Sequence, residues 1–312
     1  MRHTLLQRGL LGMLISGLLV GTAQARTLET AYGDVEVVDH PARVVTLYEG
    51  ALDAALAAGV TPVGAVTTRG GDNVAEYVTD YLSANELEHP EIVGVVREIN
   101  IEAVLAQQPD LILAAAQLPQ EQYQLLSQIA PTVVPHTQPL AADNWEAEAR
   151  LFGQALNQEE AIEEAMAAVD LRAAELAAAI AAADVGGTAF LARWMPSGPM
   201  VMSTQLIATG LLEKVGLDVQ DAGLIKADDS AHSDVLSLEN LSQVDGDWLF
   251  LATLNDDGQA ALESAKQSAA FNRLNVVQSE RVVPVNGQLW SSANGPLAAQ
   301  AILDDIENAL LP

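Results

Sequence analysis

One stretch near the middle of the chain, Asn157 to Gly187, has nearly every sequence feature of a single long helix. Asn157 is the expected N-cap, Glu160 can complete a capping box, and Gly186 and Gly187 are expected to end the helix. The apolar residues between them form one narrow helical stripe: Ile162, Met166, Val169, Ala173, Leu176 and Ile180. Because a helix rises 1.5 Å per residue, this one spans about 40 Å, the length of a domain. We predict a rigid helix that joins two lobes.

The sequence on either side of this helix predicts the lobes themselves. Short β-branched runs alternate with Ala- and Leu-rich helical runs, at spacings typical of a parallel sheet covered on both faces. A length of 312 residues favours two domains over one. We therefore predict an α/β fold with two Rossmann-like lobes, each a mostly parallel sheet flanked by helices. The expected division is a signal peptide at 1–25, an N-terminal lobe at 26–156, the helix at 157–185 and a C-terminal lobe at 186–312.

The first 25 residues have the pattern of a cleaved signal peptide. Arg2, His3 and Arg8 form a basic region, Leu10–Val20 is apolar, and Ala23–Ala25 has the small-x-small pattern of a cleavage site. The apolar run is too short to span a membrane as a helix. The sequence contains no Cys, so neither an N-terminal lipid anchor on Cys nor a disulfide is expected. We expect an exported protein in the periplasm of a Gram-negative bacterium.

The charge of the chain restricts its partners. The full sequence carries −28, and residues 1–25 hold two arginines and no acid, so the mature chain carries −28 − 2 = −30. Nucleic-acid binding depends on Lys and Arg contacts to phosphate, so this composition excludes nucleic acid as an expected partner.

A short pattern occurs once on each side of the long helix. Glu102 lies one residue into a predicted helix and Asp110 opens an apolar strand; Glu239 and Asp247 repeat this arrangement. The separation is 110 − 102 = 247 − 239 = 8 in both copies. Two lobes of similar layout leave a cleft between them. Because open α/β sheets bind ligands at the carboxyl ends of their strands, this cleft is the expected site.

Catalytic motifs are missing from the sequence. There is no G-x-S-x-G, no P-loop and no G-x-G-x-x-G after a strand, and a Cys nucleophile is impossible. The histidines at 40, 89, 136 and 232 stand alone, without the spacing of metal ligands. We therefore do not expect an enzyme.

Four segments carry a resemblance to a known family. They are RVVTLYEGALDAALAAGVTPVGAV (43–66), IVGVVREINIEAVLAQQPDLILAA (92–115), QIAPTVV (128–134) and LWSSANGPLAAQAILDDIENAL (289–310). Together they resemble the periplasmic iron–siderophore binding proteins of ABC importers, in order and over essentially the whole mature chain. The resemblance implies a bilobed fold with a helical backbone and a shallow cleft that closes only slightly.

The resemblance also implies a ligand and partners. Family members bind ferric chelates, so Fe(III) is expected within a siderophore, with no intrinsic cofactor and no protein metal ligand. Leu47–Gly50 and Pro62–Val66 resemble members that take carboxylate siderophores or ferric citrate. The expected partners are the siderophore and an inner-membrane ABC permease with its ATPase, and we expect a monomer. Two alternatives stay open: a haem, cobalamin or metal-ion carrier on the same scaffold, and an exported enzyme.

An anionic ferric chelate calls for cationic side chains at the cleft. Arg69 follows a predicted strand, Arg97 precedes the helix of the repeated pattern, and Arg193 ends the first strand of the second lobe. Because a guanidinium can bond a carboxylate through two N–H groups, these arginines are the candidate ligand contacts. An Arg that the family often has after the strand 111–115 is absent, and Gln117 and Gln120 stand there instead.

Aromatic and acidic residues complete the candidate set. Tyr48, Trp194 and Trp290 follow or lie close to predicted strand ends, so we expect them to wall the cleft. Glu102 and Glu239, one on each lobe, resemble the glutamates with which this family docks on Arg residues of the permease. Each glutamate also suits the first turn of a helix, where negative charge is favourable.

Overall fold

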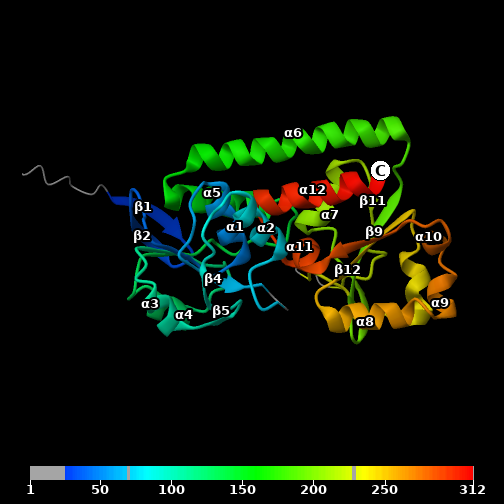
Figure 1. Ribbon diagram of the computed structural model, residues 1–312, viewed down its shortest axis with the longest axis horizontal. Coiled ribbons are helices and arrows are strands. Elements are labelled where there is room, and N and C mark those ends of the chain that lie inside the picture. Colours follow the sequence, from blue (N-terminus) through cyan, green and yellow to red (C-terminus); the bar gives the residue numbers. More distant parts are fainter. Residues whose placement is uncertain (1–24, 69–70, 227–229, 312) are drawn as a thin grey trace, which may run out of the picture.

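The computed structural model describes residues 25–68, 71–226 and 230–311. The predicted signal peptide therefore lies outside the described residues, except for Ala25. Figure 1 shows two lobes side by side along one long helix, α6 (Glu159–Ala183), as the sequence predicts. The 25 residues of this helix give it a length of about 37 Å.

The first lobe is built on a six-stranded sheet in the order β6-β5-β4-β3-β7-β8. All neighbouring pairs are parallel except β5 and β6. The strands are β3 (Val44–Thr46), β4 (Gly64–Thr67), β5 (Glu91–Val95), β6 (Glu98–Ile99), β7 (Leu111–Leu113) and β8 (Thr132–Val133). The helices are α1 (Glu49–Ala57), α2 (Glu76–Ala84), α3 (Ile101–Ala106), α4 (Gln120–Leu126) and α5 (Asn144–Leu156). An antiparallel hairpin of β1 (Ala25–Thr30) and β2 (Gly33–Val38) precedes this sheet.

The second lobe has a sheet in the order β10-β9-β12-β13, with β11 also paired to β9. Only the pairing of β10 with β9 is antiparallel among the described residues of this sheet. The strands are β9 (Thr188–Met195), β10 (Gly198–Val201), β11 (Asp218–Val219), β12 (Trp248–Thr253) and β13 (Val282–Asn286). The helices are α7 (Ile207–Lys214), the 3₁₀ helix η1 (Leu238–Val244), α8 (Asp256–Ala265), α9 (Ala269–Asn272), α10 (Asn275–Gln278), α11 (Gly287–Ser292) and α12 (Pro296–Leu310). The predicted fold class is confirmed.

The apolar stripe of α6 is buried as its spacing predicts, since all six of its residues are at most 5% exposed. The predicted start of the helix is wrong. Asn157 instead ends α5, with a left-handed backbone (φ 58°) that asparagine tolerates better than most residues. The capping box with Glu160 therefore does not form. The helix ends at Ala183, where Asp184 is left-handed (φ 55°), before the two glycines are reached.

The last helix, α12, joins the two lobes a second time. It packs against α1 and α2 of the first lobe and against α6, α7 and α11. Asp53 of α1 is fully buried, and its carboxylate accepts the backbone N–H groups of Leu297 and Ala298 at 2.9 and 2.8 Å. One hydrophobic cluster accordingly includes both Phe152 of α5 and Phe250 of β12. The lobes share a core, which the sequence did not indicate.

The repeated Glu and Asp pattern has a structural counterpart. Asp110, before β7, accepts the backbone N–H groups of Ala42 and Arg43, just ahead of β3. Asp247, before β12, accepts the N–H of Thr188 at the start of β9. In each lobe, therefore, an aspartate at the start of one strand bonds the start of the parallel strand beside it. The two lobes share this local design.

Candidate ligand-binding site between the lobes

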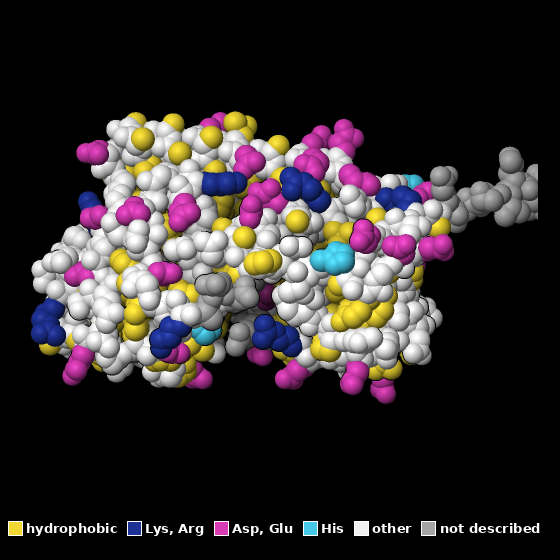
Figure 2. All heavy atoms as spheres, turned by 180° about the vertical axis from the view of Figure 1, so that it is seen from behind, with side chains coloured by type: hydrophobic (Ala, Val, Ile, Leu, Met, Phe, Trp, Pro, Cys, Tyr) yellow, Lys and Arg dark blue, Asp and Glu magenta, His cyan; other side chains and the backbone are white. Residues whose placement is uncertain are grey.

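A cavity of about 620 Å³ lies between the lobes. From the first lobe it is lined by the segments that follow β3, β7 and β8, and by α5; from the second it is lined by residues 205–207 and by Asn294. The strands thus direct their carboxyl ends at the cavity, where open α/β sheets bind ligands. Figure 2 shows a recess between the lobes on the rear side of the molecule. The volume falls in the range of about 300–1,000 Å³ typical of small-molecule sites.

Three polar residues from distant parts of the chain meet at this cavity. The side-chain amide of Asn294 donates to the hydroxyl oxygen of Tyr48 at 2.7 Å, and the Tyr48 hydroxyl also bonds the carboxyl of Glu148. Burial raises the pKa of Tyr48 well above its usual value, and the negative charges of Glu148 and Glu49 raise it further. Burial also raises the pKa of Glu148, against the opposing effect of the bond from Tyr48. The Tyr48 phenol is therefore neutral, and the group presents mainly acceptors.

A second cavity of about 610 Å³ lies elsewhere along the boundary of the lobes. Residues 253–257, at the end of β12 and just after it, line the cavity from the second lobe together with Asn286 and Gln288, and Asp72 and Glu76 line it from the first. The Asn286 amide donates to Glu76 across the boundary at 3.0 Å. Strand ends of both lobes therefore lie at their common boundary.

The predicted cationic contacts are not brought together at the first cavity. Tyr48 lines it, but Arg69 lies outside the described residues. Arg97 is exposed on the turn between β5 and β6, where its φ is 72°. Arg193 is only 4% exposed at the end of β9, with its Nη2 atom 3.8 Å from the sulfur of Met200. The lining includes neither Arg97 nor Arg193.

The two predicted tryptophan walls lie in the core. Trp194 is 2% exposed and meets Phe271 edge to face, with ring centroids 6.1 Å apart. Trp290 is fully buried, stacks on Phe250 at 4.9 Å and donates its indole N–H to Asp305 at 2.7 Å. Their position near strand ends suggested the cleft, but each ring is enclosed by neighbouring elements. Neither ring lines the cavity.

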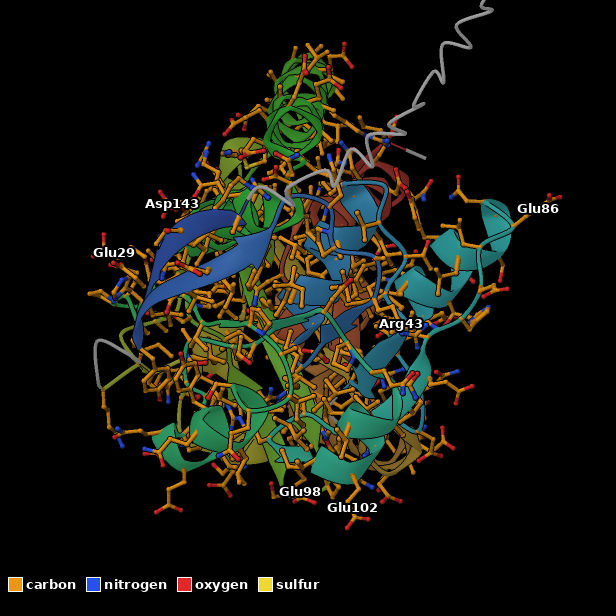
Figure 3. The ribbon with its side chains drawn as sticks, turned by 90° about the vertical axis from the view of Figure 1, so that its left-hand side faces the viewer. Glu29, Arg43, Glu86, Glu98, Glu102 and Asp143 are labelled. Atoms are coloured by element: carbon orange, nitrogen blue, oxygen red, sulfur yellow. The ribbon has the colours of Figure 1, made fainter. Side chains whose placement is uncertain are left out.

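The two glutamates of the repeated pattern are exposed on the side of the molecule away from α6. Figure 3 shows Glu102 on α3, beside Glu98, at the opposite end of the view from α6. Glu239 is exposed on η1, which packs against α9. Figure 1 places α3 and α9 at the edges of the two lobes that lie away from α6. Both lobes thus present a glutamate on the same side.

Residues 44–289, which run from β3 through β13 to α11, match the periplasmic binding protein family. This match covers both sheets and nearly all of the cavity lining. The chain belongs to this family. In the part of the protein that the structure describes, no group of three or more His, Asp or Glu side chains is arranged to hold a metal ion.

This periplasmic binding protein also has individual relatives. It is 28% identical over 300 residues to the probable siderophore-binding lipoprotein YfiY of Bacillus subtilis, covering 94% of this chain and 90% of that one. It is 26% identical over 296 residues to the Fe(3+) dicitrate-binding periplasmic protein FecB of Escherichia coli, covering 94% and 93%. Staphylococcus aureus SirA, solved with staphyloferrin B, has the same fold, with a TM-score of 0.74, 24% identity and coverage of 91% and 98%.

Sequence reasoning missed most of the cavity in this binding protein. Asn294 lies inside a segment that resembles the family, so the resemblance could have drawn attention to it. Glu148 is one of 42 acidic residues and carries no local signal. Trp145, also in the lining, was expected only as part of a helix. Only the three-dimensional packing of α5 against α1 and α6 brings Glu148 and Trp145 to the cavity.

Proposed function

We propose that this protein captures a ferric siderophore and delivers it to an inner-membrane ABC permease with its ATPase for iron uptake. The observation that carries the proposal is the cavity of about 620 Å³ lined from both lobes, in a chain of the periplasmic binding protein family. The relatives named for siderophore and ferric dicitrate binding support the ligand class. We further propose a chelate of the carboxylate or citrate type. Iron is then cargo held by the chelate, and the protein is not an enzyme.

Binding works by bringing polar groups of both lobes to one ligand. Tyr48 and Gln117 come from the first lobe, and Gln205 and Asn294 come from the second. A ligand that touches both sides stabilises the closed arrangement by the difference between its affinities for the closed and the open arrangement. We propose lobes at 26–156 and 186–312, joined by residues 157–185, which contain the backbone helix α6. Since α12 also packs on both lobes, closure is small.

Haem is the second ligand to consider, because Tyr48 and His136 line the same cavity. Tyrosine binds haem iron as a phenolate, which requires loss of the hydroxyl proton. Burial raises the pKa of Tyr48 well above its usual value, and Glu148 and Glu49 add to this effect. The phenolate is disfavoured before any iron binds, and the relatives are named for siderophore and ferric dicitrate binding, so the siderophore remains our proposal. Arg69 and Arg97 stay predictions as ligand contacts.

The experiment that tests the function uses Trp145, which is 6% exposed and lines the cavity. Tryptophan fluorescence of the purified mature chain is titrated with ferric citrate, ferrioxamine B and haemin. Saturable quenching by ferric citrate confirms the ligand class, whereas a response to haemin alone overturns it. Silence with all three overturns the function. As a control, Trp145→Phe should reduce the signal and leave the dissociation constant unchanged by calorimetry.

We propose that Glu102 and Glu239 dock the protein on the permease. Each has an exposed leucine nearby: Leu105, 57% exposed, is three residues on along α3, and Leu238, 37% exposed, precedes Glu239. Residues three apart on a helix share a face, so Glu102 and Leu105 form one small surface. The double variant Glu102→Ala/Glu239→Ala should lose iron uptake by cells while keeping its affinity for the chelate. Uptake equal to wild type would rule out this role.

We propose a periplasmic location after cleavage behind Ala25. The sequence contains no Cys for a lipid anchor, unlike a lipoprotein. Cleavage would leave Arg26 as the first residue, and its guanidinium pairs with Asp39 at 3.2 Å and with Glu159 of α6 at 3.4 Å. No helix among the described residues is long and apolar enough to cross a membrane. The mass of the purified periplasmic protein, expected to begin at Arg26, tests the cleavage. We also propose a monomer that does not bind nucleic acid.

A further inference from the structure

The cavity between the lobes has an unexpected distribution of charge. Its charged lining residues, within the described part of the chain, are the carboxylates Glu29 and Glu148, and no Lys or Arg is among them. Figure 3 shows Glu29 at the outside of the molecule, on the β1–β2 hairpin. Glu148, in contrast, is half-buried on α5. A free carboxylate of a ligand placed beside an ionised Glu148 would meet a like charge in a poorly solvated site, which is unfavourable. Burial raises the pKa of Glu148, but the bond from Tyr48 opposes this effect and favours the ionised form.

The hydrogen bonds around Glu148 determine what it can offer a ligand. The Tyr48 hydroxyl has a single proton, and the bond to Glu148 uses it while the Asn294 amide donates to the hydroxyl oxygen at 2.7 Å. Tyr48 therefore has no proton left for a ligand. A carboxylate accepts several hydrogen bonds through its two oxygens, so Glu148 retains capacity to accept more. The cavity at this point is an acceptor of hydrogen bonds.

We propose that Glu148 binds a hydrogen-bond donor of the ferric chelate, such as an ammonium, hydroxyl or amide N–H group, and so selects against chelates that present a free carboxylate there. The inference rests on the proposed siderophore-binding function. A carboxylate siderophore meets this requirement for a donor when its carboxylates coordinate iron and its hydroxyl or amide groups face Glu148. Glu148 is then a residue that determines which ligand is bound, in addition to holding Tyr48.

The test compares two probes of opposite character in wild type and Glu148→Gln. Ferric citrate offers carboxylates, and ferrioxamine B carries a free ammonium group on a hydroxamate chelate. Glutamine keeps an oxygen that accepts from Tyr48 but removes the charge. Ferric citrate should bind Glu148→Gln at least about tenfold more tightly than wild type, while any binding of ferrioxamine B weakens. Glu36→Gln, exposed on β2 and outside the cavity lining, is the matched control and should change neither affinity.

The outcomes separate this inference from the proposed function. If wild type binds neither chelate, the siderophore-binding function fails and the inference fails with it. If wild type binds ferric citrate and Glu148→Gln binds it equally or more weakly, the function stands and the role of Glu148 is refuted. If Glu148 only held Tyr48 in place, Glu148→Gln would weaken the binding of both chelates equally. Tyr48→Phe, which lacks the hydroxyl, is expected to have this effect. An unchanged melting temperature of each variant confirms that the fold is intact.

Discussion

Asp53 offers the sharpest test of how the lobes are held together. This carboxylate belongs to α1 of the first lobe, is fully buried, and caps α12 through the backbone N–H groups of Leu297 and Ala298. Burial raises its pKa from 3.8 to about 7, although the two backbone bonds oppose the shift. The hydroxyl of Tyr77 lies beside it and also lowers the pKa. The group is therefore protonated in the folded protein at pH values where it is ionised in the unfolded chain.

The pH dependence follows from these two pKa values. Because the folded value is the higher one, the contribution to stability is fully present below the unfolded pKa of 3.8 and is lost as pH rises through the folded pKa of about 7. The difference of about 3 between the two values corresponds to about 4 kcal/mol in the free energy of unfolding. Solvent screening does not reduce this figure, since Asp53 is 0% exposed. Asparagine does not titrate and cannot show this loss.

The assay is urea denaturation of wild type and Asp53→Asn across the range from about pH 4 to about pH 8, at constant ionic strength. Glu148 and Asp305 also have raised pKa values, but they are present in both proteins and cancel in the difference. The stability of wild type relative to Asp53→Asn should fall by about 4 kcal/mol from the acidic to the alkaline end. A difference that stays constant with pH would refute the raised pKa of Asp53.

Four further substitutions, one of them a control, test other parts of the structure. Gly295→Ala should lower stability by at least about 1–3 kcal/mol, because φ is +125° and a Cβ there would collide with the carboxylate that caps α12. Leu176→Ala, in the stripe of α6 and 5% exposed, should cost about 2–5 kcal/mol in urea denaturation, whereas Leu171→Ala, 63% exposed, should cost under about 0.5 kcal/mol. Trp290→Phe removes the bond that lowers the pKa of Asp305, so NMR titration should find this pKa raised further.

The sequence predicted the elements that depend on periodicity. The stripe from Ile162 to Ile180 is buried because a regular helix brings every third or fourth residue to one side, whatever it packs against. The repeated aspartates, Asp110 and Asp247, were found because each opens an apolar strand, and both bond a neighbouring strand. Such features are local, so a single sequence contains them. The role of Asn157 was predicted wrongly because this residue lies between two adjacent helices. It ends α5, whereas the sequence suggested that it begins α6.

The site itself could not be predicted in this way. Trp194 and Trp290 lie near strand ends, where a ligand would be expected, but their burial depends on helices distant in sequence. Tyr48, Glu148 and Asn294 are about a hundred or more positions apart, and no spacing rule links them. The chemistry of the cavity is therefore a property of tertiary packing.

The second connection between the lobes has a consequence for the order in which the protein folds. The central hydrophobic cluster contains residues of α1 and α5 together with Ala298, Ile302 and Ile306 of α12. Asp53, near the start of the chain, finds its backbone partners only at Leu297 and Ala298. Contacts between residues so far apart in sequence form late in folding, because the entropy cost of closing the long intervening loop must be met first. The core of the first lobe is therefore complete only when α12, which follows the second lobe in sequence, has packed against α1 and α2.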